Sequence, residues 1–488
     1  MFAVINLGLK SIRLCVLDEQ AHILFKASHP VHTVVFGLAV EQDGEEWWTL
    51  CVRLFAEARA AGFVTQRIKG LTVSASASCL ACVSEQGAML RPVMMVSDRR
   101  HHARSSPRIS DMRHRLQWLA ENEPEIYGAA RYFFSPNDYL VFRLTGVAVT
   151  DTLNAMKFAS EAGDDPYAGM APRDVARLPL VKPVGASAGL VNREAVAQLG
   201  IGPDAEVRLA TYDAIVSVAG SGASEPGDAC DVSGTVTSVR LVSNASGVHA
   251  DRKVATQFMP CFGHSYIGGS TNMGGGLVEW LKATFYEGAS HPYEQIVADA
   301  EAVAPGASRL IFLPYLLGER APLWDPDARG VFFGLERSHG RPHFARATVE
   351  AAAFVARSIL DEIETVHGAP PSRMRLSGGL SRLPVVNRVK ADVLGMPVEV
   401  VSEFESTVVG AFLLAFHEKL AAGRPLAELV KRSVRVRDIV LPDPEATVIY
   451  REKYAVFRDV YSALRPEFRK LQSFQLPTKS ADSFLANL

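Results

Sequence analysis

Two short stretches of this sequence, almost half a chain apart, share one pattern, and this repeat limits the possible folds more than any other feature. Residues 6–17, NLGLKSIRLCVL, and residues 232–243, VSGTVTSVRLVS, each place a glycine in a tight turn. Hydroxyl-bearing residues follow each glycine, and each stretch continues into a β run that contains Arg-Leu. Two glycine turns, each between strands, predict a protein built from two related halves.

The length of the chain supports the same division. A chain of 488 residues is too long for one ordinary core and is expected to form two domains. The segment ASEPGDAC, which contains Pro226 and Gly227, is the candidate boundary. We therefore predict domains at residues 1–225 and 226–472, followed by a peripheral tail at 473–488.

Strand and helix patterns alternate along the chain, which is typical of α/β proteins. The runs FAVINL, RLCVLD and AHILFKA predict an antiparallel hairpin system at the start. EEWWTLCVRLFAEARAAG and HRLQWLAENEPEIYGAA have helical spacing, and TVIYREKYAVFRDVYSALRPEF predicts a closing helix.

The composition favours a small-molecule partner. The net charge is −2 and no long Lys/Arg run is present, which argues against nucleic acid and anionic membranes as partners. No apolar run reaches the roughly 20 residues that span a bilayer. The first residues lack the basic segment of a signal peptide, so a cytoplasmic protein with reduced thiols is expected. The oligomeric state stays open, with a homodimer among the options.

Glycine clusters supply four candidate phosphate cradles, because turns that expose successive backbone N–H groups bind anions. They are Gly8 with Lys10 and Ser11, Gly234 with Thr235, GGSTNMGGGLVEWL, and LSGGLSRLPVVNRVKADVLG. Their presence in both halves indicates a polyphosphate ligand. No G-x-x-x-x-G-K-[ST] motif occurs, which excludes a Walker-type P-loop.

Asp213 lies in LATYDAIVSVAGSG, between a β-like run and a small-residue helix. One interpretation is that Asp213 caps this helix. The other is that its carboxylate accepts the proton of an attacking hydroxyl in phosphoryl transfer. We select Asp213 as the candidate catalytic residue.

The segment GERAPLWDPDARGVFFGL, residues 318–335, gathers charged residues in one loop. Pro322 and Pro326 stop a helix or a central strand from continuing through it. It is therefore predicted to be a rigid, charged surface loop. The simplest explanation is a solvated loop held by pairs between arginines and carboxylates.

This segment resembles the most recognisable part of the FGGY carbohydrate kinases, the family of xylulokinase, ribulokinase, gluconate kinase and glycerol kinase. Eight further segments resemble motifs of the family and occur in the family's order. They are GAMLRPVMMVSDRR, NDYLVFRLTG, TDTLNA, YDAIVSVAGSG, SGT, GGSTNMGGG, SGGLSRLPVVNRVKADVLG and ESTVVGAFLLA. The resemblance covers almost the whole chain. It implies the duplicated ribonuclease-H-like fold of the actin/hexokinase/Hsp70 superfamily, with an interdomain cleft beside the loop at 318–335.

The resemblance also implies roles for single residues, with ATP and Mg²⁺ as cofactors. Asp213 matches the family's general base. The residues that match its nucleotide site are Gly8, Lys10, Ser11 and Arg13 of the first phosphate loop, Gly234 and Thr235 of the second, Gly275 and Glu279 at a helix start, and Gly378 and Gly379 of the adenosine turn.

Two departures from the family pattern affect the expected chemistry. The opening motif is Asn6-Leu7-Gly8-Leu9, where the family usually has Asp-x-Gly-Thr, so Asn6 is expected to contact the metal only weakly, through water. In SASASCL, Ser76, Ala77 and Ser78 replace the larger sugar-binding side chains of a typical xylulokinase run. Smaller side chains imply a different or bulkier substrate.

The sequence thus predicts an ATP-dependent kinase that phosphorylates a hydroxyl of a ketose, polyol or related sugar. The alternative is a sugar- or nucleotide-binding protein of the same fold that has lost catalysis, which Asn6 and Leu9 motivate.

Overall fold

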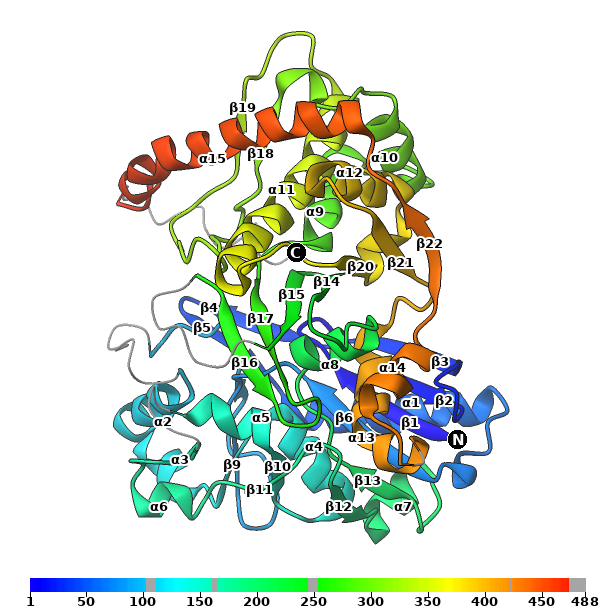
Figure 1. The fold of residues 1–488 in the computed structure, drawn as a ribbon. Helices are drawn as coiled ribbons and strands as arrows, with labels where there is room; N and C mark the ends of the chain where they lie inside the picture. The colour runs from blue at the N-terminus through cyan, green and yellow to red at the C-terminus, as the bar shows by residue number, and fades with distance from the viewer. Residues whose placement is uncertain (102–110, 160–164, 245–252, 422, 474–488) are drawn as a thin grey trace. The chain divides into compact units, whose positions relative to one another are not determined.

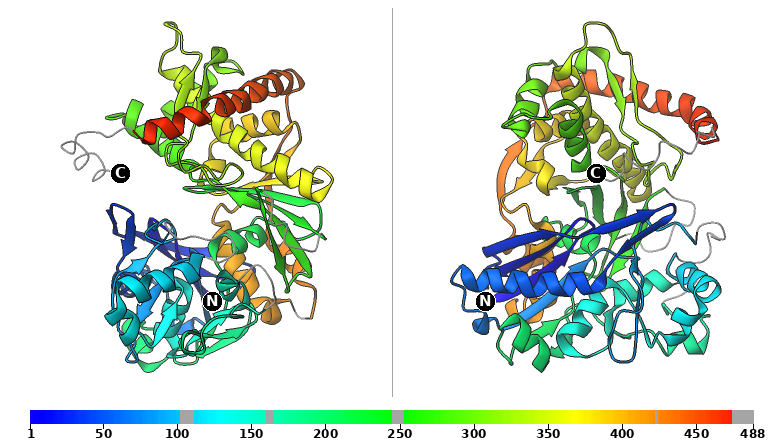
Figure 2. Two further views of the ribbon diagram at one scale, coloured as in Figure 1. Left: turned by 90° about the vertical axis from the view of Figure 1, so that its left-hand side faces the viewer. Right: turned by 180° about the vertical axis from the view of Figure 1, so that it is seen from behind.

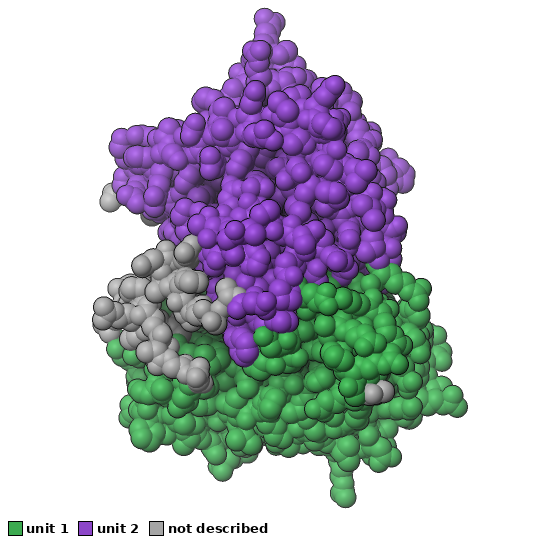
Figure 3. Space-filling view, viewed as in Figure 1, with its two compact units in different colours: residues 1–225, 259–263, 405–435 green, residues 226–258, 264–404, 436–488 purple. Residues whose placement is uncertain are grey.

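The computed structural model describes residues 1–101, 111–159, 165–244, 253–421 and 423–473 (Figure 1). The chain divides into two compact units (Figure 3). Unit 1 consists of Met1–Glu225, Met259–Gly263 and Glu405–Arg435. Unit 2 consists of Pro226–Phe258, His264–Phe404 and Val436–Leu488. Apart from Ser473, the predicted tail lies outside the described residues.

Unit 1 is built on a six-stranded sheet, accompanied by smaller sheets and helices. In spatial order the strands of its main sheet are β12 (Ser187–Leu190), β13 (Glu206–Arg208), β6 (Gly70–Ala75), β1 (Phe2–Leu7), β2 (Ser11–Leu17) and β3 (Ile23–Pro30). The smaller sheets contain β4 (Thr33–Phe36), β5 (Ala39–Gln42) and β8 (Val93–Met94); β7 (Ala81–Val83) and β9 (Tyr132–Phe134); and β10 (Val149–Asp151) and β11 (Leu180–Lys182). The helices are α1 (Gly44–Ala60), η1 (Thr65–Arg67), α2 (Asp111–Asn122), α3 (Pro124–Ala129), α4 (Pro136–Thr145), α5 (Thr152–Ala155), η3 (Met156–Phe158), α6 (Pro172–Val175), α7 (Arg193–Leu199), α8 (Asp213–Gly220), α13 (Ser406–Leu420) and α14 (Leu426–Ser433).

Unit 2 is built on a seven-stranded sheet. In spatial order its strands are β16 (Ala255–Met259), β17 (His264–Ser270), β15 (Thr237–Ser243), β14 (Asp228–Ser233), β20 (Arg373–Ser377), β21 (Val398–Val401) and β22 (Val436–Val440), and a separate pair is formed by β18 (Ile311–Leu313) and β19 (Val331–Phe333). The helices are α9 (Gly275–Phe285), α10 (Pro292–Glu301), η4 (Ala307–Arg309), α11 (Arg341–His367), η5 (Gly379–Arg382), α12 (Pro384–Leu394) and α15 (Pro444–Gln472).

The two main sheets share one topology. In unit 1, β1, β2 and β3 form an antiparallel meander, and β6 and β13 continue the sheet parallel to β1. In unit 2, β14, β15 and β17 form the meander, and β20 and β21 continue it parallel to β14. An antiparallel edge strand follows in each, β12 or β22. The predicted α/β fold with duplicated halves is confirmed.

Alternating residues of β1 face helices on opposite sides of the sheet. Ala3, Ile5 and Leu7 belong to a core that includes Trp47 and Phe55 of α1, the helix seen in front of these strands in the right-hand view of Figure 2. Phe2, on the other face, packs against two phenylalanine rings of α13. This alternation follows from the two-residue period of a strand.

The segment 405–435 belongs to unit 1 although its sequence lies inside the predicted second domain. Helix α13 packs against α8 at two glycines with almost no space between the backbones. A Cβ at Gly220 would lie 1.8 Å from the Ser406 carbonyl oxygen, and one at Gly410 would lie 1.7 Å from that of Val216. The units are therefore not consecutive stretches of sequence, and the functional domains 1–225 and 226–472 stay a prediction.

The predicted local elements occur, with one refinement. The three opening strands, the first helix and the closing helix lie where the sequence places them. The stretch 114–130 forms two helices, α2 and α3, because Pro124 begins a new helix. Within the described part of the chain, no helix has both the length and the apolar character needed to cross a bilayer. No cysteine of the described residues is in a disulfide, including Cys79 and Cys82, which are buried.

Candidate active site

Asp213 lies at the edge of the unit 1 sheet where the parallel strands β1, β6 and β13 end. It is the first residue of α8, and the N-cap position is occupied by Tyr212, whose side chain makes no capping bond. One carboxylate oxygen, Oδ1, accepts the Ala214 N–H at 2.7 Å, and Oδ2 accepts the Ser76 hydroxyl at 3.2 Å. The side chain is thus fixed at the carboxyl ends of the strands, where ligands of α/β sheets bind.

The first glycine turn joins β1 to β2 beside Asp213. The Ser76 N–H donates to the Leu7 carbonyl at 3.2 Å, which connects the end of β6 to the end of β1. Gly8 closes the turn by donating its N–H to the Ser11 carbonyl at 2.9 Å. Lys10 is exposed within this turn, so its ammonium is available to an anion.

Asn6 is buried under this turn, and its amide group has partners at both ends. Its Nδ2 donates to the Ser74 carbonyl at 3.3 Å, and its Oδ1 accepts from Arg13 Nη1 at 3.4 Å. The same Arg13 atom lies 3.3 Å from a carboxylate oxygen of Glu405. Since Mg²⁺ prefers anionic oxygen ligands, a carbonyl that faces a guanidinium does not fit direct metal coordination. The first turn fits a phosphate better, and the water-mediated metal contact of Asn6 stays a prediction.

The predicted sugar-binding segment follows β6 directly. Ser76 contacts Asp213, and Ala77 and Ser78 are partly exposed. Ser78 adopts a φ of 58°, and its carbonyl accepts a hydrogen bond from the fully buried Arg115. Arg115 also donates to the carbonyls of Met95 and Val96, so one buried guanidinium holds this segment in place.

The second glycine turn joins β14 to β15 in unit 2. Gly234 and Thr235 are exposed, and a Cβ added at Gly234 would meet no atom within 4 Å. The Gly234 carbonyl accepts the N–H of Gly275 at 2.7 Å, which brings the start of α9 to the turn. A helix N-terminus beside exposed backbone amides is a favourable place for an anion. Glu279, one turn further along α9, is bonded to Lys282 and Tyr293.

The turn after β20 contacts the same loop. Gly378 has a φ of 86°, and a Cβ at this position would lie 2.5 Å from the Ser233 carbonyl oxygen. Only glycine fits there without displacement. Gly379 is exposed, with open space around its Cα. The structure therefore brings together Gly234, Gly275 and Gly378 within unit 2.

A buried ion pair supports the second turn from below. Lys390 of α12 donates to Asp231 Oδ2 at 2.5 Å and to the Ser233 hydroxyl at 2.9 Å. Asp231 and Lys390 side chains are each 1% exposed. Ser233 also donates to Asp231 Oδ1 at 2.5 Å and lies 2.9 Å from the Thr237 hydroxyl. This network fixes the last residues of β14 and the first residue of β15.

Comparisons with known proteins agree with this arrangement. Residues 237–418 match the FGGY family of carbohydrate kinases, C-terminal domain. A gluconokinase of Bacillus licheniformis is 27% identical over 379 residues, which cover 74% of this chain and 72% of that protein. A xylulose kinase of Staphylococcus epidermidis is 26% identical over 504 residues, 94% of this chain and 95% of that protein. Residues 237–418 therefore carry the C-terminal domain of the FGGY carbohydrate kinases, and the chain is similar to sugar kinases over most of its length.

The fold of the chain is also similar to that of a solved kinase structure. The crystal structure of gluconate kinase from Lactobacillus acidophilus superposes with a TM-score of 0.83, at 21% identity, over 96% of this chain and 99% of that chain. The predicted enzyme class, a sugar kinase, is confirmed by the family. Among the described residues, no group of three or more His, Cys, Asp or Glu side chains forms a metal cluster.

The FGGY signature loop at 318–335 differs from the charged surface loop expected from sequence. Its carboxylates Glu319 and Asp325 are buried, 4% and 5% exposed. Glu319 accepts backbone N–H groups of Asn272 and Arg320, both at 2.7 Å. Burial raises the pKa of Glu319 to about 7. The expectation of a loop held by exposed pairs between arginines and carboxylates is wrong for these two residues.

Asp325 is held mainly by a hydroxyl group. It accepts the Tyr461 hydroxyl at 2.7 Å and the Asp327 N–H at 3.0 Å, while Arg465 stands 3.6 Å away. The charges within the loop do not indicate this hydrogen bond, because Tyr461 belongs to α15, more than 130 positions along the chain.

The sequence did not indicate several side chains that support the candidate site. Arg115 holds the predicted sugar-binding segment, Glu405 pairs with Arg13 and Lys26, and Lys390 pairs with Asp231. The sequence contains one indication of the pair between Lys390 and Asp231. Lys390 lies on the helix face that carries Val386 and Val389, and charged residues at core-facing positions usually have a partner of opposite sign.

Proposed function

We propose that this protein transfers the γ-phosphoryl group of ATP to a hydroxyl of a ketose, polyol or related sugar, with Asp213 as the general base. The position of Asp213 carries the proposal. Its carboxylate stands at the carboxyl ends of three parallel strands, held by the Ser76 hydroxyl at 3.2 Å and next to the candidate sugar segment. A base in that position can take the proton of an attacking hydroxyl.

In this proposal, residues near the first glycine turn act on the sugar, and residues near the second bind the nucleotide. Ser76, Ala77 and Ser78 orient the sugar, and Asp213 accepts the hydroxyl proton as the oxygen attacks the γ-phosphorus. In the nucleotide site, the exposed amides of Gly234 and Thr235 and the start of α9 at Gly275 hold phosphate oxygens, and Gly378 and Gly379 receive the adenosine. Phosphoryl transfer depends mainly on such positioning and charge neutralisation.

ATP and Mg²⁺ are the proposed cofactors. Bound with the nucleotide, Mg²⁺ would neutralise part of the phosphate charge, and Lys10 and Arg13 would add positive charge from this chain. The exposed second turn fits a nucleotide, since the space beside Gly234 is open.

One observation favours an acidic sugar among the substrates. The Lys157 ammonium lies 4.2 Å from the centre of the Tyr212 ring, one residue before Asp213. Within the described residues Lys157 has no carboxylate partner. A cation without a carboxylate partner, against the residue that precedes Asp213, suits the carboxylate of an aldonate such as gluconate.

The proposal is tested by measuring ADP formation in a coupled assay with D-gluconate, D-xylulose and glycerol. Turnover with at least one of them supports a kinase, and Lys157→Met is expected to raise KM for D-gluconate more than for D-xylulose. Binding of ATP and of a sugar with no turnover on any compound would instead support the alternative, a binding protein that has lost catalysis.

A further inference from the structure

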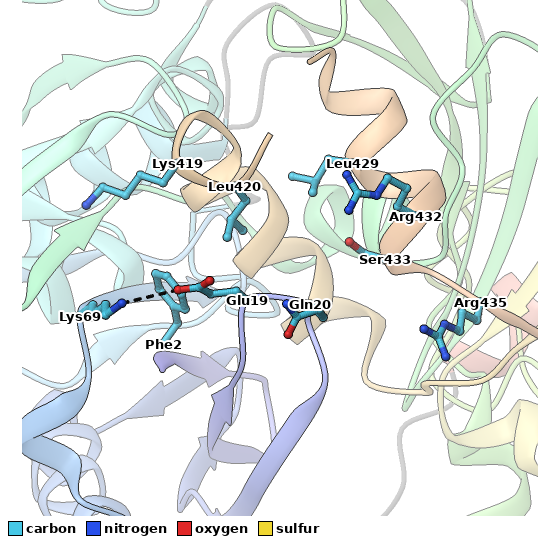
Figure 4. A pocket seen from close by; sticks show the side chains of 10 residues that line it. All are labelled: Phe2, Glu19, Gln20, Lys69, Lys419, Leu420, Leu429, Arg432, Ser433 and Arg435. Carbon is cyan, nitrogen blue, oxygen red and sulfur yellow. Dashed lines mark ion pairs between the residues drawn. The ribbon is translucent and has the colours of Figure 1, made fainter. Parts of the chain in front are cut away.

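A hollow of unit 1 lies away from the proposed catalytic residues. It has a volume of about 620 Å³ and lies where β1 begins, at Phe2, and where Lys69 precedes β6 (Figure 4). Glu19 and Gln20, which follow β2, form another part of its wall. Asp213 and the first glycine turn lie at the carboxyl ends of the same strands, roughly 20 Å away for a strand of six residues. The pocket is therefore separate from the candidate active site.

The remaining wall comes from the end of α13, from α14 and from the chain after it. It is formed by Lys419, Leu420, Leu429, Arg432, Ser433 and Arg435. Together with Lys69, the pocket has four cationic side chains against one carboxylate, Glu19. Such an excess of positive charge favours an anionic ligand.

Two of these cations are already neutralised, and two are not. Lys69 lies 3.5 Å from Glu19, and Lys419 pairs with Glu206. Neither Arg432 nor Arg435 has a carboxylate partner among the described residues, and both are exposed. An uncompensated charge of two remains at one side of the pocket.

The dipole of helix α14 explains the position of only one of the two arginines. A cation in the last turn of a helix interacts favourably with the helix dipole, which accounts for Arg432 in α14. Arg435 lies beyond the helix end, where that interaction fades. Lys431, the neighbour of Arg432 in the same helical turn, differs from the two arginines. Its ammonium pairs with Glu225 at 2.6 Å, and it does not line the pocket.

Phe2, Leu420 and Leu429 supply the apolar part of the lining, and Leu429 lies beside Arg432 (Figure 4). Phe2 is buried against two phenylalanine rings of α13, and Leu429 is also buried. Gln20 and Ser433 add groups that can form hydrogen bonds. Pockets of about 300–1,000 Å³ with apolar walls and a few placed polar groups are typical of small-molecule sites. Guanidinium groups bind phosphate oxygens in pairs of hydrogen bonds.

We propose that this pocket binds a small organic phosphate monoester, with the phosphate on Arg432 and Arg435 and the carbon part against Phe2 and Leu429. The inference goes beyond the proposed kinase reaction, since it concerns a second ligand at the opposite edge of the sheet. The shared chemistry of sugar phosphates and nucleoside monophosphates fits the site, and the experiment separates them.

The test is isothermal titration of the full chain, with ADP and Mg²⁺ saturating the proposed nucleotide site. The probes are glucose 6-phosphate, AMP and inorganic phosphate. Either organic probe is expected to bind at one site, and more tightly than inorganic phosphate. In Arg432→Gln/Arg435→Gln the affinity should fall by about 100-fold, because each lost charge-assisted contact typically weakens binding by about tenfold.

A matched control removes the same charge from the same segment. Arg424 pairs with Glu428 and Lys431 with Glu225, and neither lines the pocket. Arg424→Gln/Lys431→Gln is therefore expected to bind the organic probe as the parent does. Equal weakening in both double variants, unchanged binding in Arg432→Gln/Arg435→Gln, or no binding of any probe to the parent would overturn the proposal. Equal affinity for inorganic phosphate would overturn the apolar part of it.

Discussion

The two glycine turns occupy equivalent places in the two sheets, yet the residues beneath them differ. Under the turn of unit 1, the buried Asn6 is neutral, and its amide oxygen accepts a hydrogen bond from Arg13, whose side chain is 35% exposed. Under the turn of unit 2, Asp231 and Lys390 form an ion pair of which each side chain is 1% exposed. The same topology thus has a neutral buried side chain beneath the turn of one unit and a buried ion pair beneath the turn of the other.

This difference predicts that substitutions in the two units affect different properties of the protein. A buried ion pair is costly to break, because the remaining partner stays desolvated. A partly exposed pair such as that of Arg13 with Glu405 contributes less, because water screens it in part. We therefore expect substitutions at the candidate active site of unit 1 to change turnover, and substitutions beneath the turn of unit 2 to change stability first.

The largest effect is expected for Asp213→Asn in unit 1. The amide cannot accept the proton, and loss of general-base assistance typically costs about 10²–10⁴ in rate. Turnover is measured in the coupled assay, with ADP binding and the melting temperature expected to stay near those of the parent. Asp204→Asn, at an exposed position of the same unit, is the control. Near-normal turnover in Asp213→Asn would remove this residue from the mechanism.

The next largest effect is expected for Lys390→Met in unit 2, which leaves Asp231 buried and unpaired. Breaking a buried pair in this way typically costs about 3–5 kcal/mol, seen as a lower melting temperature. Lys390→Met/Asp231→Leu should recover most of the loss, because no unpaired charge remains. Arg13→Met breaks the partly exposed pair of unit 1 and leaves Glu405 paired with Lys26, so it should cost at most about 1 kcal/mol. Similar losses in the two single variants would contradict the comparison.

A pH effect is expected for Glu319, the buried carboxyl of the signature loop in unit 2. Burial raises its pKa from 4.5 to about 7, against the opposing influence of Arg320 and two backbone N–H groups. The folded state therefore binds this proton more tightly than the unfolded state, and its contribution to stability is lost as pH rises from about 4.5 to 7.

Glu319→Gln removes this titration. Between pH 4.5 and 7, the parent should lose about 3 kcal/mol more than the variant, since one pKa unit corresponds to about 1.4 kcal/mol. Melting temperatures measured across this pH range provide the test. Parallel pH profiles for the two proteins would show that folding does not raise the pKa of Glu319.

A smaller effect is expected for Ala77→Met in the sugar segment of unit 1. If the segment lines the sugar site, the larger side chain should raise KM for the sugar and leave KM for ATP nearly unchanged. If Ala77 is only a packing residue, the result should be a loss of about 1–3 kcal/mol in stability, as overpacking typically causes. Steady-state kinetics with both substrates varied, together with thermal melting, distinguishes the two cases.

The smallest effect is expected for Asn6→Asp. A carboxylate at this position loses the donor to the Ser74 carbonyl and gains an ion pair with Arg13, 3.4 Å from the present amide oxygen. Because Arg13 offsets part of the new charge, the Mg²⁺ concentration for half-maximal turnover should fall by less than about tenfold. An unchanged Mg²⁺ dependence would mean that residue 6 does not influence the metal.

The sequence by itself determined the local elements and the family. The two-residue period of the opening strands and the helical spacing of residues 447–468 reflect backbone geometry, which neighbouring residues decide. The glycine turns at Gly8 and Gly234 were predictable for the same reason, and the shared sheet topology confirms that they belong to duplicated halves. The position of Asp213 at a strand-to-helix junction also followed from local pattern.

Only the tertiary structure decided which distant segments meet. Helix α13 joins unit 1 because Gly220 and Gly410 let two backbones touch, and no local pattern reports a contact between residues so far apart. Asp231 and Lys390 are separated by 159 positions, and Asp325 and Tyr461 by 136. Burial of these charges depends on packing that the whole chain creates, since a carboxylate is stable in a core only where a distant donor reaches it.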